Sequence, residues 1–294
     1  MSAMIPTEVL RKVRRIQIVT SALVSDMFAG QYHSAFKGRG MEFEEVREYL
    51  PGDDVRTIDW NVTARTGRPF VKNFREEREL TVLLVVDVSA SQHFGTRDQL
   101  KSELVAELGA TLAFSAIQNN DKVGLLLFTD RIERFVPARK GTRHVLRVVR
   151  ELLYHEPQGR GTDVGVALEH VSRVLRRRAV VFLISDFQTP AFAGPLQIVR
   201  HRHDVIPVVV QDERERRLPP VRYVELFDPE TGEQLLVNTS GRAFQERFRQ
   251  LGDERRAALL GQLRRMRLDA IEVSTGESFV EPLRRFFHRR ERRR

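Results

Sequence analysis

The sequence contains no cysteine among its 294 residues. This absence excludes disulfide bonds, cysteine-ligated zinc, iron–sulfur clusters and thiol catalysis, and it fits a reducing compartment. No uninterrupted apolar stretch approaches about 18 residues, so we expect no transmembrane helix. The first 20 residues include the charged Glu8, Arg11 and Lys12 and lack the apolar run of a signal peptide. We therefore expect a soluble, cytoplasmic protein.

Lysine is scarce, because only six of the 49 basic residues are Lys and the rest are Arg. Against 40 acidic residues this leaves a formal net charge of +9. The hydrophobic content of 41% and the charged content of 30% are typical of a globular protein. These proportions exclude wholesale disorder, collagen-like repetition and a coiled-coil rod.

The N-terminal quarter of the chain changes character near residue 30. Apolar residues recur at mostly helical spacing over residues 5–28, which predicts an amphipathic opening helix. Residues 30–74 are instead rich in turn sequences such as PGDD and TGRP, in which Gly and Pro favour tight turns. We expect residues 1–75 to form an opening helix followed by a small β-rich unit.

From residue 80 the pattern is that of an α/β protein. Residues 80–86 are almost uniformly apolar, which is typical of a strand that helices cover on both faces. We expect residues 76–294 to form an open, mostly parallel sheet flanked by helices, with a hairpin insertion near 221–239. Further strands are predicted at 122–128, 132–136, 179–185, 205–210 and 268–273, and helices at 98–119, 142–154, 163–177, 240–266 and 279–288.

Oxygen-bearing side chains follow the predicted strands. Asp87, Ser89 and Ser91 alternate directly after the first strand, and Asp186 follows the strand at 179–185. Thr162 precedes a predicted helix that Asp163 is expected to cap. Because ligands of open α/β sheets bind at the carboxyl ends of the strands, we expect the oxygen side chains to converge there. Carboxylate and hydroxyl oxygens suit a hard divalent cation, Mg²⁺ above all.

In this order the motifs resemble a von Willebrand factor A-like domain with a metal-ion-dependent adhesion site. The five positions of that family's motif match Asp87, Ser89, Ser91, Thr162 and Asp186. The resemblance implies that these residues hold Mg²⁺ or Mn²⁺, and that one coordination position stays open for an acidic side chain of a partner. Hydroxyl ligands neutralise little of the cation's charge, so the cation would still attract an external carboxylate.

A second resemblance lies upstream of the metal motif. Residues 38–60 (GRGMEFEEVREYLPGDDVRTIDW), followed by ARTG at 64–67 and FREE at 74–77, resemble the signature of the domain-of-unknown-function 58 (DUF58) family. The similarity extends more loosely to Phe287. It implies an adaptor that works with a MoxR-type AAA+ ATPase in chaperone-like complex maturation. Some members of that family carry N-terminal transmembrane helices, so peripheral membrane contact through a partner stays an alternative.

The upstream block has two interpretations. Its acidic residues alternate with arginines, which favours a folded β-unit held by Arg–carboxylate pairs and anchored by Phe43 and Trp60. The alternative is a docking face for a partner.

The sequence lacks the common catalytic motifs. No P-loop, no Gly-x-Ser-x-Gly elbow and no His-Glu-x-x-His helix occurs. We therefore expect a non-enzymatic protein, with two alternatives left open. A metal-dependent hydrolase could use the Asp87 site, and the Arg-rich C-terminus, residues 284–294, could bind nucleic acid or anionic lipid. The second alternative is disfavoured because base-stacking aromatic residues are not interleaved with the arginines in any recognisable nucleic-acid-binding module.

Overall fold

The computed structural model describes residues 29–36, 41–76, 79–95, 99–189, 192–228 and 232–293. These residues form two compact units: unit 1 holds the described residues up to Ala35 and from Thr81 onward, and unit 2 those from Phe36 to Leu80. The opening helix predicted over 5–28 lies outside the described residues. Within the described ranges, no helix combines the length and the apolar character that a membrane crossing requires.

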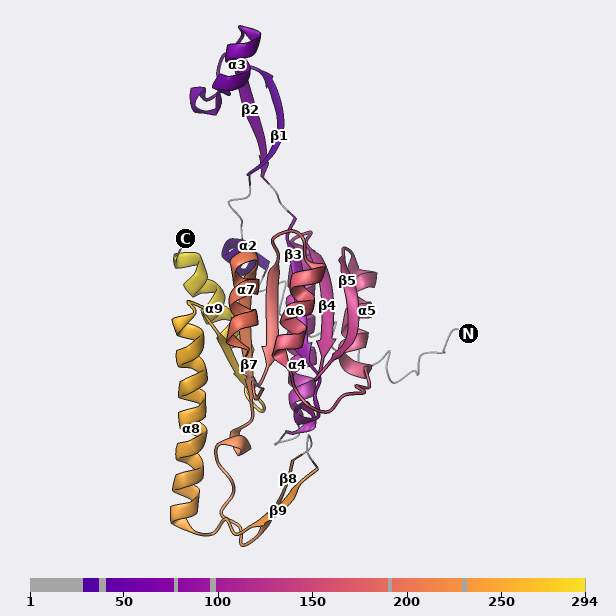
Figure 1. Ribbon diagram of the computed structural model, residues 1–294, viewed down its shortest axis with the longest axis vertical. Helices are drawn as coiled ribbons and strands as arrows, with labels where there is room; N and C mark the ends of the chain where they lie inside the picture. Colours follow the sequence, from indigo (N-terminus) through magenta and orange to yellow (C-terminus); the bar gives the residue numbers. More distant parts are fainter. Residues whose placement is uncertain are drawn as a thin grey trace, which may run out of the picture. The chain divides into compact units, whose positions relative to one another are not determined.

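Unit 1 is built on a six-stranded sheet with the order β10-β7-β6-β3-β4-β5. All neighbouring strands run parallel except β5, which is antiparallel to β4. The mostly parallel α/β sheet predicted from the sequence is therefore confirmed (Figure 1). The strands are β3 (Thr81–Asp87), β4 (Lys122–Phe128), β5 (Ile132–Arg139), β6 (Val180–Ser185), β7 (Asp204–Gln211) and β10 (Ile271–Ser274).

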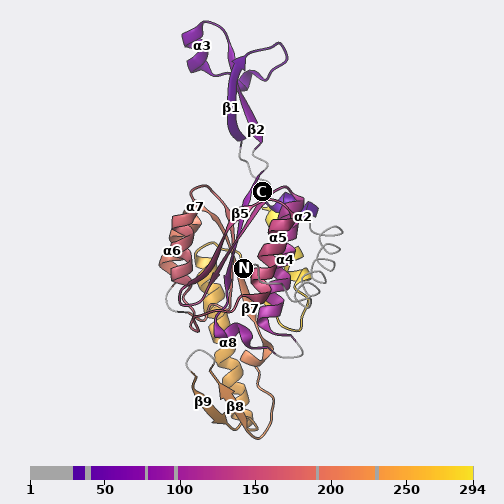
Figure 2. The ribbon, with the colours of Figure 1, turned by 90° about the vertical axis from the view of Figure 1, so that its right-hand side faces the viewer.

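Helices cover both faces of this sheet, as Figure 2 shows. Alternate residues of β3 point to opposite faces, and Leu83 packs in a core cluster with Leu168 of α6 and Leu196 of α7. On the other face Gly109 of α4 lies so close to α5 that a Cβ atom there would come within 2.9 Å of Leu152 Cδ1. The helices are α4 (Lys101–Gln118), α5 (Thr142–Tyr154), α6 (Val164–Val174), α7 (Ala193–Arg202), α8 (Arg242–Arg265) and α9 (Val280–Arg292).

Two helices of the structure differ from the sequence-based expectation. Helix α2 (Ala29–Phe36) occupies the start of the segment for which turns and short strands were predicted, so that prediction is wrong there. Its Tyr32 is buried and packs edge-on against Phe287, which gives this short segment a tertiary contact that its turn-like sequence does not reveal. Helix α7 falls in a stretch for which no helix was predicted.

The predicted hairpin insertion is present. Strands β8 (Val224–Phe227) and β9 (Gln234–Val237) pair antiparallel, with Val224 opposite Val237. The hairpin leads into α8, and β10 then returns to the edge of the sheet before α9 ends the described chain.

Unit 2 is a two-stranded ribbon with small helical turns. Strands β1 (Met41–Glu48) and β2 (Phe70–Glu76) pair antiparallel, and helix α3 (Trp60–Thr66) follows the short 3-10 turn η2 (Val55–Thr57). The predicted β-rich character and its Arg–carboxylate pairing are present, since the Arg47 guanidinium donates two hydrogen bonds of 2.8 Å to Asp53.

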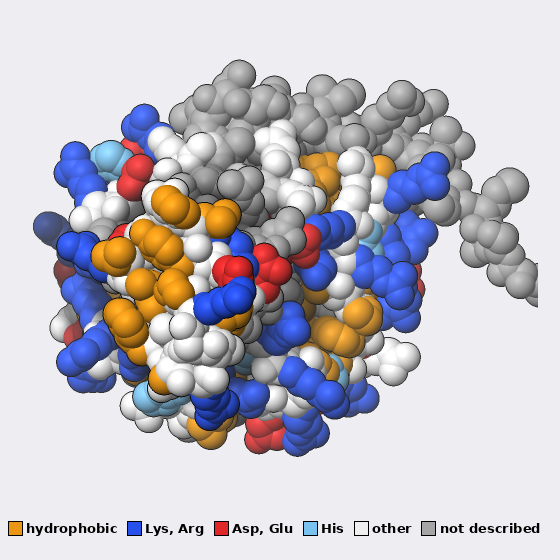
Figure 3. Space-filling view, turned by 90° about the horizontal axis from the view of Figure 1, so that it is seen from above, with side chains coloured by type: hydrophobic (Ala, Val, Ile, Leu, Met, Phe, Trp, Pro, Cys, Tyr) orange, Lys and Arg blue, Asp and Glu red, His pale blue; other side chains and the backbone are white. Residues whose placement is uncertain are grey.

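The expected anchoring role of Trp60 is wrong, because this side chain is 69% exposed. Trp60 is the first residue of α3, which Asp59 caps by accepting from the backbone N–H groups of Asn61 and Val62. The unit is thus held in part by a cap and an ion pair, and Leu50, Val55 and Trp60 lie exposed at its surface. The side chain of Phe43, the other predicted anchor, lies outside the described residues. Figure 3 shows hydrophobic side chains gathered at the surface beside acidic and basic ones.

Candidate functional site

Two carboxylates meet at the carboxyl edge of the parallel sheet. Asp87 is the last residue of β3, and Asp186 directly follows β6. The two strands are neighbours in parallel register, with Val86 beside Ile184, so both acids emerge at the same edge. Both side chains are buried, because Asp87 is 2% exposed and Asp186 is 6% exposed. The convergence predicted from strand ends therefore occurs for this pair.

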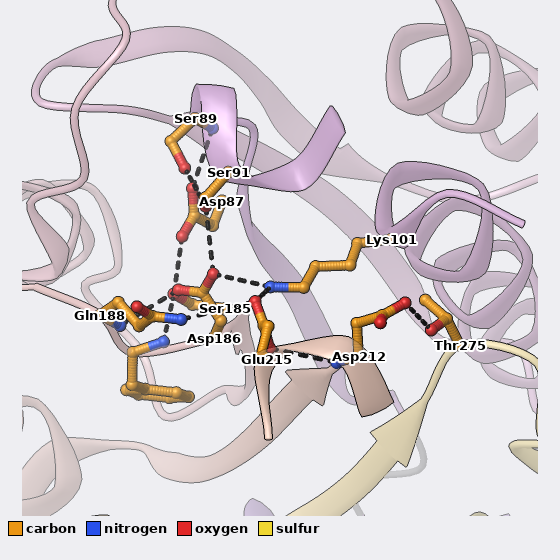
Figure 4. A network of polar contacts seen from close by, with 11 residues as sticks. Asp87, Ser89, Ser91, Lys101, Ser185, Asp186, Gln188, Asp212, Glu215 and Thr275 are labelled. Atoms are coloured by element: carbon orange, nitrogen blue, oxygen red, sulfur yellow. Dashed lines mark hydrogen bonds and ion pairs between the residues drawn. The ribbon is translucent and has the colours of Figure 1, made fainter. Parts of the chain in front are cut away.

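Two serines connect these carboxylates in one chain of hydrogen bonds. The Ser89 hydroxyl lies 3.0 Å from the Ser91 hydroxyl, which donates to Asp186 Oδ2 at 3.1 Å. The Ser89 backbone N–H donates to Asp87 Oδ1 at 2.9 Å, and the Ser185 hydroxyl donates to Asp87 Oδ2 at 2.7 Å. Four of the five side chains predicted to hold a cation thus lie together, as Figure 4 shows.

The fifth predicted residue, Thr162, lies in an adjoining loop. Its backbone carbonyl accepts from Thr189 Oγ1 at 3.1 Å, and its side chain is buried. The same loop is tied to the serine segment, because the Ala90 N–H donates to the Arg160 carbonyl at 3.0 Å. Asp163 caps α6 as expected, accepting from the Gly165 N–H at 2.8 Å. These hydrogen bonds hold the backbone of the Thr162 loop beside the segment that carries Ser89 and Ser91. They do not show whether the Thr162 hydroxyl would bind a cation.

The backbone beside Asp186 is strained. Phe187 has a φ of 59°, a left-handed conformation that a bulky side chain rarely adopts. Its N–H donates to Ser185 Oγ at 3.0 Å, and the following Gln188 N–H donates to Asp186 Oδ1 at 3.1 Å. Strain of this kind persists only where surrounding contacts fix it, and it is concentrated at functional sites.

A buried lysine, Lys101, completes the network and was not predicted from the sequence. Its ammonium group lies 3.1 Å from Asp186 Oδ2 and also contacts Glu215, and its side chain is fully buried. The signal for it was present, because residues 101, 104 and 108 follow the helical spacing of a buried stripe in which Leu104 and Leu108 occupy the later positions. A charged residue in such a stripe requires a charged partner.

Burial and mutual repulsion shape the electrostatics of the two site carboxylates. Burial is the main cause that raises the pKa of Asp87 to about 7, and the negative charge of Asp186 raises it further. The hydrogen bonds from Ser185 and Ser89 lower this pKa, but by less. The Asp87 carboxylate is therefore short of positive charge in its neighbourhood.

Lys101 neutralises only part of this charge. Burial alone would lower the pKa of Lys101, but the negative charges of Asp186 and Glu215 raise it above its ordinary value. Burial raises the pKa of Glu215, and the Lys101 ammonium offsets only part of that rise. One ammonium group is thus shared by two carboxyl groups, those of Asp186 and Glu215.

The donor set suits a hard divalent cation. Among the residues that the structure describes, no group of three or more His, Cys, Asp or Glu side chains is placed to hold a metal ion. A cation at this edge would therefore depend on two carboxylates supplemented by hydroxyls, which is chemistry that Mg²⁺ accepts. Gln92, which follows Ser91, is 2% exposed, and its side-chain amide has no hydrogen-bond partner within the described part of the chain. A buried polar group of this kind normally has one, which is consistent with a further ligand or water here.

A separate buried acid, Glu133 on β5, fixes the Thr162 loop. It accepts from the Gly159 N–H at 2.7 Å, the Gln158 N–H at 3.0 Å and the Thr129 hydroxyl at 2.8 Å. Sequence reasoning did not identify this residue, since its donors lie in a loop about 25 positions away.

Four of the C-terminal arginines pair with acidic side chains of the protein. Arg284 and Arg285 pair with Glu281, Arg290 contacts Asp204, and Arg293 contacts Asp269. Because these pairs neutralise part of the basic charge, less of it is available to a polyanion than the sequence suggests.

This chain is similar in sequence to proteins that are themselves uncharacterized. A family model described as "Protein of unknown function DUF58" matches residues 45–258. Uncharacterized protein Rv1480 of Mycobacterium tuberculosis is 35% identical over 223 residues, which cover 75% of this chain and 70% of that protein. Uncharacterized protein YeaD of Bacillus subtilis is 26% identical over 122 residues, or 42% of this chain and 27% of that protein.

Among solved structures, the conserved hypothetical protein BatB of Bacteroides thetaiotaomicron aligns with 72% of this chain and 99% of its own, at 13% identity. The TM-score of this alignment is 0.45.

Proposed function

This chain belongs to the DUF58 family, and from that membership we propose that it is a divalent-cation-dependent protein-interaction module. In this proposal unit 1 is a von Willebrand factor A-like domain, and Mg²⁺ or Mn²⁺ binds at the carboxyl edge of its sheet. An acidic side chain of a partner protein then completes the cation's coordination. The proposal is non-enzymatic and includes a cytoplasmic location, which the absence of cysteine favours.

One observation carries the proposal. Two carboxylates and two hydroxyls from segments about 95 residues apart in the chain join in one hydrogen-bonded group at this edge. If these residues only capped helices, each would lie separately at the start of its own helix. Here the Ser91 hydroxyl instead donates a hydrogen bond directly to Asp186 on the neighbouring strand end. Burial and the neighbouring Asp186 carboxylate raise the pKa of Asp87, and the positive charge of a divalent cation would oppose both effects.

The protein's own residues would prepare the site in three ways. The backbone N–H groups of Ser89 and Gln188 hold Asp87 and Asp186 in position. The neutral hydroxyls of Ser89 and Ser91 contribute oxygens without cancelling charge, so a bound cation would still attract an external carboxylate. Burial excludes water from Asp87 and so strengthens every electrostatic interaction around it.

The family resemblance makes a MoxR-type AAA+ ATPase the first partner to test. An acidic residue on that protein would meet the cation, and the DUF58 protein would act as an adaptor in complex maturation. This partnership is part of the proposal, as are the identity of the cation and the ligand roles of the five predicted residues.

The test combines cation binding and partner capture. We expect Asp87→Ala to abolish Mn²⁺ binding, followed by electron paramagnetic resonance, while the far-ultraviolet circular dichroism stays native. Capture of a purified MoxR-type ATPase from the same genome should require Mg²⁺ and fail for the variant. Asp253→Ala is the control, since Asp253 is an exposed acid paired with Arg216 on the surface. Capture that persists in EDTA would contradict the proposal.

A further inference from the structure

Lys101 shares a single oxygen atom with the proposed cation site. Asp186 Oδ2 accepts from the Ser91 hydroxyl at 3.1 Å and from the Lys101 ammonium at 3.1 Å. Figure 4 shows the ammonium between Asp186 and Glu215, beside the Asp186 oxygen that Ser91 also contacts. Any cation held by Ser91 and Asp186 would therefore lie close to a fixed positive charge.

We propose that Lys101 is a built-in competitor for the divalent cation. Its ammonium group supplies the positive charge beside Asp186 in the absence of the cation, and it relies on Glu215 when the cation takes over Asp186. The inference rests on the proposed function, because the cation is the one proposed there. It adds that the affinity for the cation depends on how the Lys101 ammonium group is shared between the Asp186 and Glu215 carboxylates.

A purely structural role explains the lysine less well. Lys101 is the first residue of α4, and a positive charge is unfavourable at a helix N-terminus. Burying an ammonium group is also expensive, and an apolar side chain of similar volume often stabilises a protein equally well. The presence of a lysine at this position is explained if its positive charge is required beside Asp186.

Glu215 is suitably placed to receive the charge. Its second carboxylate oxygen accepts from the Asp212 N–H at 3.1 Å, which fixes the side chain in the short 3-10 turn η4 (Glu213–Glu215) after β7. The residue therefore offers Lys101 a stationary partner that does not depend on the cation. Neutralising Glu215 should leave the ammonium wholly to Asp186 and so strengthen the competition.

The experiment measures Mn²⁺ affinity of the full chain by isothermal titration calorimetry, with Mn²⁺ alone as the probe. Lys101→Met should tighten binding at least about tenfold, because it removes a unit positive charge from the vicinity of the cation. Glu215→Gln should weaken binding severalfold. Lys140→Met is the matched control and should change nothing, since Lys140 follows β5 at the opposite end of the sheet, where Arg139 pairs with Val123.

The double variant Lys101→Met/Glu215→Gln separates competition from a general electrostatic effect. If Glu215 acts through Lys101, its substitution should no longer weaken binding once the lysine is gone. Should Lys101→Met fail to fold by circular dichroism, Lys101→Gln takes its place in both the single and the double variant, because it removes the same positive charge and keeps a polar end to contact Asp186 and Glu215.

Each outcome has one meaning. Unchanged or weaker binding by folded Lys101→Met, alongside binding by the wild type, overturns the inference and leaves the proposed function standing. Binding by Lys101→Met but not by the wild type supports strong internal competition. Absence of Mn²⁺ binding in both proteins overturns the proposed cation site, and the inference with it.

Discussion

Asp87 and Glu133 are both buried carboxylates near the carboxyl edge of the sheet, yet their surroundings differ in kind. Glu133 accepts hydrogen bonds from two backbone N–H groups and from the Thr129 hydroxyl, with no second carboxylate among these partners. Burial raises the pKa of Glu133, but these hydrogen bonds outweigh it and lower the pKa overall. The pKa of Asp87 is instead raised to about 7 by burial and by Asp186.

The difference separates an anchoring acid from an acid available for binding. Where donors surround a carboxylate, its charge is already stabilised and its role is to fix the chain. Where a second carboxylate is close, positive charge is lacking, and this is the condition for cation binding. The loop that Glu133 fixes includes Thr162, so the anchor also supports the candidate site.

The largest effect on stability should come from Glu133→Ala. The substitution leaves the N–H groups of Gln158 and Gly159 without their acceptor and removes one of the two acceptors of the Thr129 hydroxyl, so we expect a loss of about 3 kcal/mol in the free energy of unfolding. Urea denaturation would measure it. Glu169→Ala, which removes a surface pair with Arg173, should lose under about 1 kcal/mol. Equal losses in the two variants would show that Glu133 is no anchor.

A smaller effect should appear as a dependence on pH. Because the pKa of Glu133 is lower in the folded than in the unfolded protein, its charge stabilises the fold above the unfolded pKa. That contribution is lost as the pH falls through the folded pKa. The free energy of unfolding should therefore drop less steeply on the acid side for Glu133→Gln than for the wild type. Parallel curves, measured by urea denaturation at a series of pH values, would contradict the assignment.

Gly159 offers a second way to test the anchor. A Cβ atom at this position would lie 2.2 Å from both Asp130 Oδ1 and Thr129 Oγ1, so the loop approaches these side chains as closely as only glycine permits. Gly159→Ala should displace the Thr129 side chain and lower the melting temperature. A native melting temperature in differential scanning calorimetry would show that the loop has room to adjust.

Much of the fold could be predicted because it follows from local pattern. The apolar run of β3 indicated a strand covered on both faces, and the helix predicted over 142–154 coincides with α5. Helix α2 could not be predicted, because its residues are fixed by contacts such as that of Tyr32 with Phe287. Alternating strands and helices thus sufficed for the sheet, whereas short segments depended on tertiary packing.

The candidate site was predictable in part for the same reason. Strand ends of a parallel sheet share an edge, so Asp87 and Asp186 could be placed together from the sequence. Lys101 and Glu215 are 114 positions apart, and no periodicity relates one to the other. Only the unusual position of a lysine in a buried stripe indicated that a distant acid would be required.

The smallest change in stability is expected for Asp87→Asn, and it gives the most direct test of the difference between Asp87 and Glu133. Asp87→Asn keeps the size of the side chain and the oxygen that accepts from the Ser89 N–H, and it removes the repulsion from Asp186. These gains offset the altered bond with Ser185, so in EDTA the free energy of unfolding should stay within about 1 kcal/mol of the wild type. Added Mn²⁺ should stabilise the wild type and not the variant, because only a state that binds the ion gains free energy from it. A loss in EDTA as large as that of Glu133→Ala would mean that Asp87 is itself an anchor, and the distinction between the two acids would fail.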